Sequence, residues 1–155
     1  MIRRARDADA TAIHACLSRA FAAYESDYTP GAFRDTVPSP VHIRERIKRG
    51  VVLIAAGAPD EESAAGTLTA FPEGKHAHLR GMAVDPRHQG TGLARALLQH
   101  VEAEVAALGV RQITLEVTAP LERATHVYQS AGYSRTGRER PYFGMMLFEY
   151  AKAIP

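Results

Sequence analysis

The spacing of apolar residues changes several times along the chain and divides it into helices and strands. Four segments carry apolar residues three and four positions apart, as on one face of a helix: 7–24, 39–49, 92–108 and 120–132. Seven others alternate apolar with polar residues or form short apolar runs, as strands do: 2–5, 51–57, 64–71, 76–84, 112–118, 133–137 and 143–150. This order predicts one α/β domain over residues 1–155, with a mixed, mostly antiparallel sheet of about seven strands and helices on both faces.

Polar residues, glycines and prolines mark the ends of these elements. Asp7 is expected to cap the first helix, and Ser39 followed by Pro40 to begin the second. Pro120 is expected to start the last helix and Gly132 to stop it. Three segments without a regular period are expected to be loops or turns: 25–40, 59–62 and 138–141.

The fourth predicted strand changes its alternation midway. The apolar residues before Gly81 are at odd positions, Ala77 and Leu79, whereas those after it are at even positions, Met82 and Val84. Side chains alternate strictly along a strand, so this change requires one extra residue between the two pairs. The pattern predicts a β-bulge at Gly81, although a glycine that only eases packing would also fit. A bulge leaves a backbone N–H near the strand end available to a ligand oxygen.

Directly after this strand, a glycine-rich turn leads into the helix at 92–108. The N–H groups in the first turn of a helix have no partner within it, so they favour an anion such as phosphate, and glycines let that anion approach the backbone. A dinucleotide-binding fingerprint would need glycine where Arg95 stands, and the Gly-Lys-Ser/Thr of a P-loop does not occur here. The alternative is a turn that binds nothing. The residues expected to bind a diphosphate are Gln89, Gly90, Thr91, Gly92, Leu93 and Ala94.

Composition narrows the function classes. The 155 residues suffice for a buried core, and 46% of them are hydrophobic without a run long enough to span a membrane. A net charge of +2 gives no reason to expect nucleic-acid binding. Cys16 is the one cysteine and lies among apolar residues at helical spacing, so we expect it in the core and not as a nucleophile. No export signal follows the basic N-terminus, which favours a cytoplasmic location.

Two motifs in the second half of the chain point to a known family. Residues 89–94 fit the pattern Gln/Arg-x-x-Gly-x-Gly/Ala, shortly after a strand that ends at Val84. A second pattern, Asn-x-x-Ala-x-x-x-Tyr-x-x-x-Gly-Phe/Tyr, is met by residues 121–133, except that Leu121 stands at the asparagine position. Over residues 76–133 the chain therefore resembles the GNAT superfamily of acetyl-CoA-dependent N-acetyltransferases, whereas its N-terminal third matches only in the order of elements.

The resemblance implies transfer of an acetyl group from acetyl-CoA to a primary amine, and it assigns roles to individual residues. Turn 89–94 would bind the CoA diphosphate, and the two central strands would splay where the cofactor enters. The backbone of Met82, Ala83 and Val84 would bind the pantetheine amides, and the N–H freed by the bulge would bind the thioester carbonyl. Tyr128 would be the general acid that protonates the departing CoA thiolate, unless it only packs beside the cofactor.

The amine must lose a proton before it attacks, because its reference pKa is about 10.4. His78 occupies the strand position at which the histone-modifying branch of the family carries a glutamate base, and imidazole suits this role near neutral pH. Glu116, on the neighbouring strand, is the competing candidate, directly or through a water. The structural alternatives are an exposed histidine and a salt-bridge partner. His76 and His88 are expected to face solvent, and no metal site is expected because His76 and His78 have no third ligand nearby.

Two other functions are consistent with the cofactor turn. One is a non-catalytic acyl-CoA-binding sensor or partner module, and the other is nucleotide binding, for which the sequence shows no adenine pocket or magnesium ligand. The expected partners are acetyl-CoA and an amine, without nucleic acid or membrane, and a homodimer is left open. No motif identifies the acceptor, but four residues after the first helix are candidates to attract a cationic amine: Tyr24, Glu25, Asp27 and Tyr28.

Overall fold

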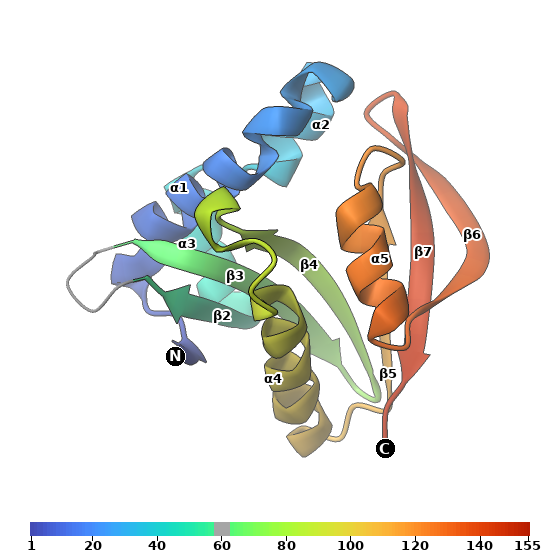
Figure 1. Ribbon diagram of the computed structural model, residues 1–155. Coiled ribbons are helices and arrows are strands. Elements are labelled where there is room, and N and C mark those ends of the chain that lie inside the picture. The colour runs from blue at the N-terminus through green and yellow to red at the C-terminus, as the bar shows by residue number, and fades with distance from the viewer. Residues whose placement is uncertain (58–62) are drawn as a thin grey trace.

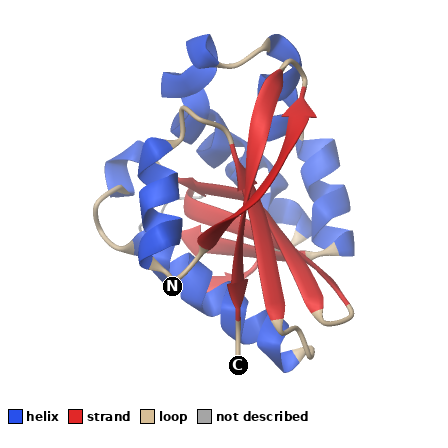
Figure 2. Ribbon diagram, turned by 90° about the vertical axis from the view of Figure 1, so that its right-hand side faces the viewer, coloured by secondary structure: helices blue, strands red, loops and turns tan. Residues whose placement is uncertain are grey.

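The computed structural model describes residues 1–57 and 63–155, so the expected turn at 59–62 lies outside the described residues. The sheet has seven strands. Figure 1 shows helices on both of its faces, and Figure 2 shows its twist. The strands are β1 (Ile2–Arg4), β2 (Val51–Ala56), β3 (Ala64–Glu73), β4 (His76–Val84), β5 (Gln112–Val117), β6 (Ser134–Tyr142) and β7 (Met145–Ala153). The α-helices are α1 (Ala10–Phe21), α2 (Pro30–Thr36), α3 (Pro40–Arg49), α4 (Leu93–Ala107) and α5 (Glu122–Ser130).

The strand order confirms a mixed, mostly antiparallel sheet. The strands follow one another as β1-β2-β3-β4-β5-β7-β6, and within the described residues only β4 and β5 are parallel neighbours. Their pairing extends from His76 opposite Gln112 to Leu79 opposite Leu115 and then stops. Beyond that point the two strands diverge into a wedge (Figure 1), so the end of β4 has a backbone edge that β5 does not cover. The splay implied by the resemblance is therefore present.

Two apolar clusters hold the helices on opposite faces of the sheet. Helices α4 and α5 contribute to one cluster, with Leu97 and Tyr128 among its buried residues, while α1 and α3 contribute to the other. A single strand can contribute side chains to both clusters because successive side chains point to opposite faces of the sheet: Leu53 of β2 belongs to the first cluster and its neighbour Val52 to the second. Cys16 is buried in the second cluster, as expected for a core residue. None of the described helices is both long and apolar enough to cross a membrane.

The predicted bulge is present in β4. The register between β3 and β4 shifts by one residue between Arg80 and Ala83, so Gly81 and Met82 together lie opposite Leu68 of β3. Gly81 has a φ of 66°, in the left-handed region that side chains other than glycine rarely adopt. As a result Met82 packs in the same cluster as the apolar residues before the bulge, whereas Ala83 packs in the opposite one.

Segment 25–40 is mostly helical, contrary to the expected loop. A 3₁₀ helix at Ala22–Asp27 continues from α1, and α2 spans Pro30–Thr36. The Thr29 side chain caps α2 by accepting the N–H of Ala32 at 3.2 Å. A helix of seven residues makes only two turns, which is too short for a helical period to show in the sequence.

The first expected helix cap is wrong and the second is confirmed. Asp7 lies within the short 3₁₀ turn that precedes α1, where the Asp9 carboxylate accepts the N–H of Arg6 at 2.7 Å. The carboxylate that satisfies this helix start is therefore two residues later than expected. At the start of α3, the Ser39 hydroxyl accepts the N–H of His42 at 3.5 Å.

Two boundaries in the last third of the chain also differ. Helix α5 begins at Glu122, and Pro120 lies in the turn before it. Gly132, with a φ of 98°, ends the helix as expected. Residues 138–141 belong to β6, and the hairpin turn lies at Phe143, with a φ of 49°, and the glycine after it. The charged residues 138–140 resembled a turn because β6 is a largely exposed edge strand.

Candidate active site

A groove of about 470 Å³ runs along the uncovered edge of β4 to the start of α4. We call it the β4 groove. Thr91 turns its hydroxyl toward the carbonyl of His88, at 2.6 Å, and does not line the groove. The other residues expected to bind the cofactor all line it: Met82, Ala83, Val84, Gln89, Gly90, Gly92, Leu93, Ala94 and Tyr128.

The glycine turn at the end of the groove has the backbone of an anion site. Gly90 has a φ of 79° and Gly92 a φ of 83°, and a Cβ at either position would stand in open space. Both glycines are therefore required by backbone conformation and not by crowding within the protein. Gly92 is the residue before α4, so the unpaired N–H groups of the first helical turn follow directly on it.

Asp85 anchors this turn to the rest of the molecule. Its side chain is 1% exposed and forms ion pairs with Arg19 of α1, at 2.6 Å, and Arg87, at 3.1 Å. Hydrogen bonds from Arg87 and Arg19 hold the pKa of Asp85 well below its usual range, although burial acts in the opposite direction. The carboxylate thus ties the exit from β4 to the helix on the far face of the sheet.

Gln89 and Arg123 close the side of the groove toward α5. The Gln89 amide donates to the carbonyl of Val84 at 3.3 Å, and its oxygen accepts from Arg123 at 2.6 Å. Arg123 lines the groove and adds a positive charge that sequence reasoning missed, although it lies inside the second motif. His88 also lines the groove and is half-buried, with its Nδ1 shielded from solvent, so it is only partly exposed.

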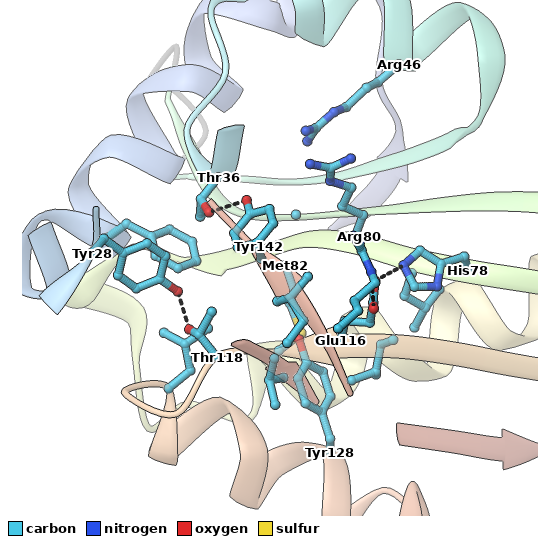
Figure 3. A pocket seen from close by; sticks show the side chains of 18 residues that line it. Tyr28, Thr36, Arg46, His78, Arg80, Met82, Glu116, Thr118, Tyr128 and Tyr142 are labelled. Carbon is cyan, nitrogen blue, oxygen red and sulfur yellow. Dashed lines mark hydrogen bonds and ion pairs between the residues drawn. The ribbon is translucent and has the colours of Figure 1, made fainter. Parts of the chain in front are cut away.

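A second cavity, of about 120 Å³, adjoins the groove and is called the inner cavity here. Its walls come from β4, β5, β6, β7 and the helices of the N-terminal segment. It shares Phe21, Met82, Leu121 and Tyr128 with the β4 groove. In Figure 3 the ring of Tyr128 rises from α5 toward Met82 of β4, so the two hollows meet between these side chains.

The two candidate bases lie next to each other on the wall of the inner cavity. His78 Nε2 is 3.5 Å from a Glu116 carboxylate oxygen, and His78 Nδ1 is 3.0 Å from the Thr114 hydroxyl. Burial lowers the pKa of His78 although Glu116 raises it, which favours a neutral ring near pH 7. Arg140 binds both oxygens of Glu116, at 2.6 and 2.8 Å, and lowers the pKa of that carboxyl. His76 is half-buried and contacts the same Thr114 hydroxyl at 2.8 Å, so it is only partly exposed to solvent.

Tyr128 is 8% exposed, and burial raises the pKa of its phenol. Its ring meets that of Tyr133 edge to face, with centroids 6.1 Å apart. Among residues 1–57 and 63–155 no hydrogen-bond partner is found for the Tyr128 hydroxyl, whereas the Tyr133 hydroxyl donates to Glu102 at 2.9 Å. The Tyr128 hydroxyl is therefore a protonated donor at the junction of the two cavities.

The residues expected to attract a cationic amine are only partly at the site. Tyr24 lines the β4 groove and Tyr28 lines the inner cavity, while Glu25 and Asp27 line neither. The hydroxyl of Tyr28 is hydrogen-bonded to Thr118 at 2.6 Å. Neither acidic residue among positions 24–28 therefore lines the β4 groove or the inner cavity.

Three arginines on the walls of the inner cavity were not predicted. Arg46 comes from α3, Arg80 from β4 and Arg140 from β6, so no local pattern connects them in the sequence. Arg80 hydrogen-bonds to Asp35 of α2, and Arg140 pairs with Glu116. The cavity is thus rich in guanidinium groups, with two of them matched by carboxylates.

Comparison with known proteins identifies the family. The sequence model of the acetyltransferase (GNAT) family matches residues 11–133, which is most of the chain. The chain belongs to the GNAT family. This match extends over the first helix, beyond the residues whose motifs indicated the resemblance.

Related proteins agree with the GNAT assignment. The ribosomal protein bS18-alanine N-acetyltransferase of Escherichia coli (strain K12) is 40% identical over 67 residues, which cover 43% of this chain and 45% of that protein. The chain thus spans less than half the length of the curated relatives it matches. Its fold is that of the Escherichia coli ribosomal-protein-S18-alanine N-acetyltransferase, with a TM-score of 0.72, 23% identity and coverage of 99% and 93%. The PaiA N-acetyltransferase of Thermoplasma acidophilum in complex with coenzyme A has a TM-score of 0.79, 16% identity and 96% coverage of both chains.

The second GNAT motif follows the wall between the two cavities. Leu121 lines both of them, so the position that has asparagine in the pattern offers an aliphatic side chain here and no polar contact. Ala124 lines the β4 groove, Tyr128 lies at the junction and Gly132 ends the helix. The spacing of the motif thus sets one side of α5 against the groove.

Proposed function

We propose that this GNAT protein is an N-acetyltransferase that moves the acetyl group of acetyl-CoA to a primary amine by direct attack in a ternary complex. The observation that carries the proposal is the meeting of the β4 groove and the inner cavity between Met82 and Tyr128. One substrate held in each hollow would bring its reactive end to this point. Such placement supplies much of the rate acceleration, because two bound reactants no longer need to collide in solution.

The position of Cys16 supports direct attack over a covalent acetyl-enzyme. Its thiol is buried in the cluster between α1 and the sheet and lines neither cavity. Burial raises the pKa of Cys16 to about 11, so the reactive thiolate is scarce near neutral pH. The amine itself is then the nucleophile.

Acetyl-CoA supplies an acetyl group activated as a thioester, and the residues of the β4 groove fit it. The backbone at Gly90 and Gly92, the first turn of α4 and the Arg123 guanidinium would hold the diphosphate. The uncovered edge of β4 over residues 82–84 would pair with the pantetheine amides as a strand would. The N–H freed at the Gly81 bulge would donate to the thioester carbonyl and stabilise the charge that develops on its oxygen.

His78 is the residue we propose to accept the proton of the amine. Its lowered pKa leaves a neutral ring with a nitrogen able to accept, and Glu116 at 3.5 Å would stabilise the imidazolium once it forms. Glu116 is the weaker base, because Arg140 occupies both of its oxygens. Transfer from an alkylammonium to imidazole is uphill by ~5 kcal/mol in water. Glu116 would offset part of this cost, because its negative charge raises the pKa of His78.

Tyr128 is proposed to donate its hydroxyl proton toward the sulfur as the C–S bond breaks. The raised pKa keeps the phenol protonated, which preserves it as a donor over the whole range of assay pH. The same shift makes complete transfer to a thiolate unfavourable, because the reference pKa of a thiol is only about 8.5. The main contribution of Tyr128 is then a hydrogen bond that strengthens as negative charge builds up on sulfur.

Calorimetry with acetyl-CoA, CoA and ATP tests the binding half of the proposal. We expect micromolar dissociation constants for the first two and little binding of ATP. Release of the CoA thiol with a panel of primary amines tests the transfer half. Binding of acetyl-CoA without transfer to any amine would favour a non-catalytic acyl-CoA sensor, and preferential binding of ATP would favour a nucleotide-binding protein.

A further inference from the structure

One of the three arginines that line the inner cavity has no carboxylate partner among the described residues. Arg140 is paired with Glu116, and Arg80 with Asp35. No acidic side chain in the described part of the chain forms an ion pair with Arg46, although Arg46 lines the cavity beside the other two arginines. A half-buried guanidinium without a counter-ion is costly unless a ligand supplies one.

Asp35, whose negative charge raises the pKa of Arg46, is already engaged. One oxygen of Asp35 accepts hydrogen bonds from Arg80 and from the Tyr142 hydroxyl, the latter at 2.6 Å. Figure 3 shows the guanidinium groups of Arg46 and Arg80 directed toward each other. Burial, and after it the charge of Arg80, lower the pKa of Arg46 to about 10, so Arg46 is still charged at neutral pH. A bound anion would offset both the cost of burying the charge of Arg46 and its repulsion by Arg80.

Arg46 lies close to the place where the chemistry is proposed to occur. Its Nη1 is 3.1 Å from the position that a Cβ on Gly81 would take, so the guanidinium stands beside the bulge. His78 and Met82 line the same cavity from the same strand. A group bound by Arg46 would therefore lie within a few bonds of an amine that attacks at the bulge.

We propose, building on the proposed N-acetyltransferase function, that the acceptor is a small amine with a carboxylate a few bonds from its nitrogen, and that Arg46 binds this carboxylate. A guanidinium matches a carboxylate with two parallel hydrogen bonds, which also fixes the orientation of the molecule. The amine would then point toward His78. The unmatched positive charge disfavours polyamines and lysine-rich segments, because they bring further cations into a cavity that already has one in excess.

A matched panel of acceptors tests the substrate class on the wild-type protein. Free L-amino acids, β-alanine and 4-aminobutyrate are compared with their carboxamides, with the corresponding amines that lack the carboxylate, and with short peptides that have a free N-terminus. CoA release and acetylated product are measured with each. We expect kcat/KM for the best carboxylate-bearing acceptor to exceed that for its carboxamide at least tenfold, because only the carboxylate pairs with the guanidinium.

Variants at Arg46 assign this preference to the side chain. Arg46→Gln should raise KM for the carboxylate at least tenfold and leave KM for the carboxamide unchanged, and Arg46→Lys should restore part of the affinity because it keeps the charge. Arg44→Gln is the matched control, because Arg44 is exposed on the same helix and lines neither cavity. Acetyl-CoA affinity should be alike in all of these proteins, and none of the variants should melt below the wild type, which shows that they are folded.

Different results overturn the inference and the proposed function. The inference is wrong if carboxamides, simple amines or peptide N-termini are acetylated as well as the carboxylates, or if Arg46→Gln slows every acceptor equally. Failure to bind acetyl-CoA, or to acetylate any amine, contradicts the function instead. In that case calorimetry with the same amino acids still decides the anion site. Amino-acid binding that is present in the wild type and lost in Arg46→Gln supports the anion site. Absence of binding by any carboxylate overturns it.

Discussion

Replacing Tyr128 by phenylalanine is expected to slow acetyl transfer without weakening the fold. In the described residues the Tyr128 hydroxyl has no hydrogen-bond partner, so removing it leaves no buried group unpaired. The ring keeps its area and its edge-to-face contact with Tyr133. We expect the free energy of unfolding to change by less than about 0.5 kcal/mol. We expect kcat to fall at least tenfold, which corresponds to about 1.4 kcal/mol in the barrier.

The same substitution at Tyr133 provides the control. Tyr133 is 2% exposed, lines neither cavity, and donates its hydroxyl to one oxygen of Glu102 at 2.9 Å. Tyr133→Phe deprives that carboxylate of a donor, although Lys152 still binds the other oxygen at 2.9 Å. We expect a loss of about 1–2 kcal/mol in the free energy of unfolding and an unchanged kcat.

The two variants should therefore show opposite effects, although the rings touch. Steady-state CoA release at saturating acetyl-CoA gives kcat, calorimetry gives the acetyl-CoA affinity, and thermal unfolding gives the stability. A Tyr128→Phe protein with wild-type kcat would refute the donor role and leave Tyr128 as a wall of the site. A large loss of stability in Tyr128→Phe would refute the conclusion that its hydroxyl is unpaired.

Other parts of the site give further expected results. Gly92→Val should weaken acetyl-CoA binding at least tenfold, because a side chain would stand where the backbone meets the diphosphate. Gly109→Val is the control: Gly109 also has a positive φ but lies away from both cavities, so its replacement should lower stability alone. Equal acetyl-CoA affinities of the two variants in calorimetry would contradict the diphosphate site. The rate losses in His78→Ala and Glu116→Ala should shrink as the pH of the assay rises toward the amine pKa of about 10.4, and equal, pH-independent losses would leave the proton to bulk water. Asp85→Asn should lower the free energy of unfolding by about 2 kcal/mol at neutral pH. The folded-state pKa of Asp85 lies below its usual 3.8, so the ionised carboxylate stabilises the fold fully above that pH and loses this effect as the pH falls. A difference in the free energy of unfolding between wild type and Asp85→Asn that is equal at neutral and acid pH would contradict this expectation.

Most of the β4 groove could be predicted because residues 82–94 are continuous in the sequence. The parity change around Gly81 requires a bulge, and the residues of the turn that follows lie next to each other along the chain. The short helix α2 was missed because two turns do not establish a period. The cytoplasmic location and the homodimer stay predictions, as do the roles of the individual site residues.

The inner cavity could not be predicted because long-range contacts assemble it. Arg140 reaches Glu116 from β6 although β7 lies between their strands in the sheet, and no local pattern encodes that pair. The expected turn at 138–141 concealed the role of this arginine. In the sequence Arg46 is one of several basic residues between positions 44 and 49, and only the fold places its guanidinium beside the bulge.

The wedge between β4 and β5 also divides the protein into two consecutive pieces of chain. Residues 1–107 contain β1 to β4 with the first four helices, residues 112–153 contain β5 to β7 with α5, and in the described structure four residue pairs join the two parts of the sheet. The β4 groove takes walls from both pieces. A chain cut in the turn at 108–111 would leave each antiparallel ladder intact, and reassembly of the fragments would depend on the shared apolar cluster and on the molecule in the groove. Split in this way, the protein would report occupancy of the β4 groove as association of two polypeptides.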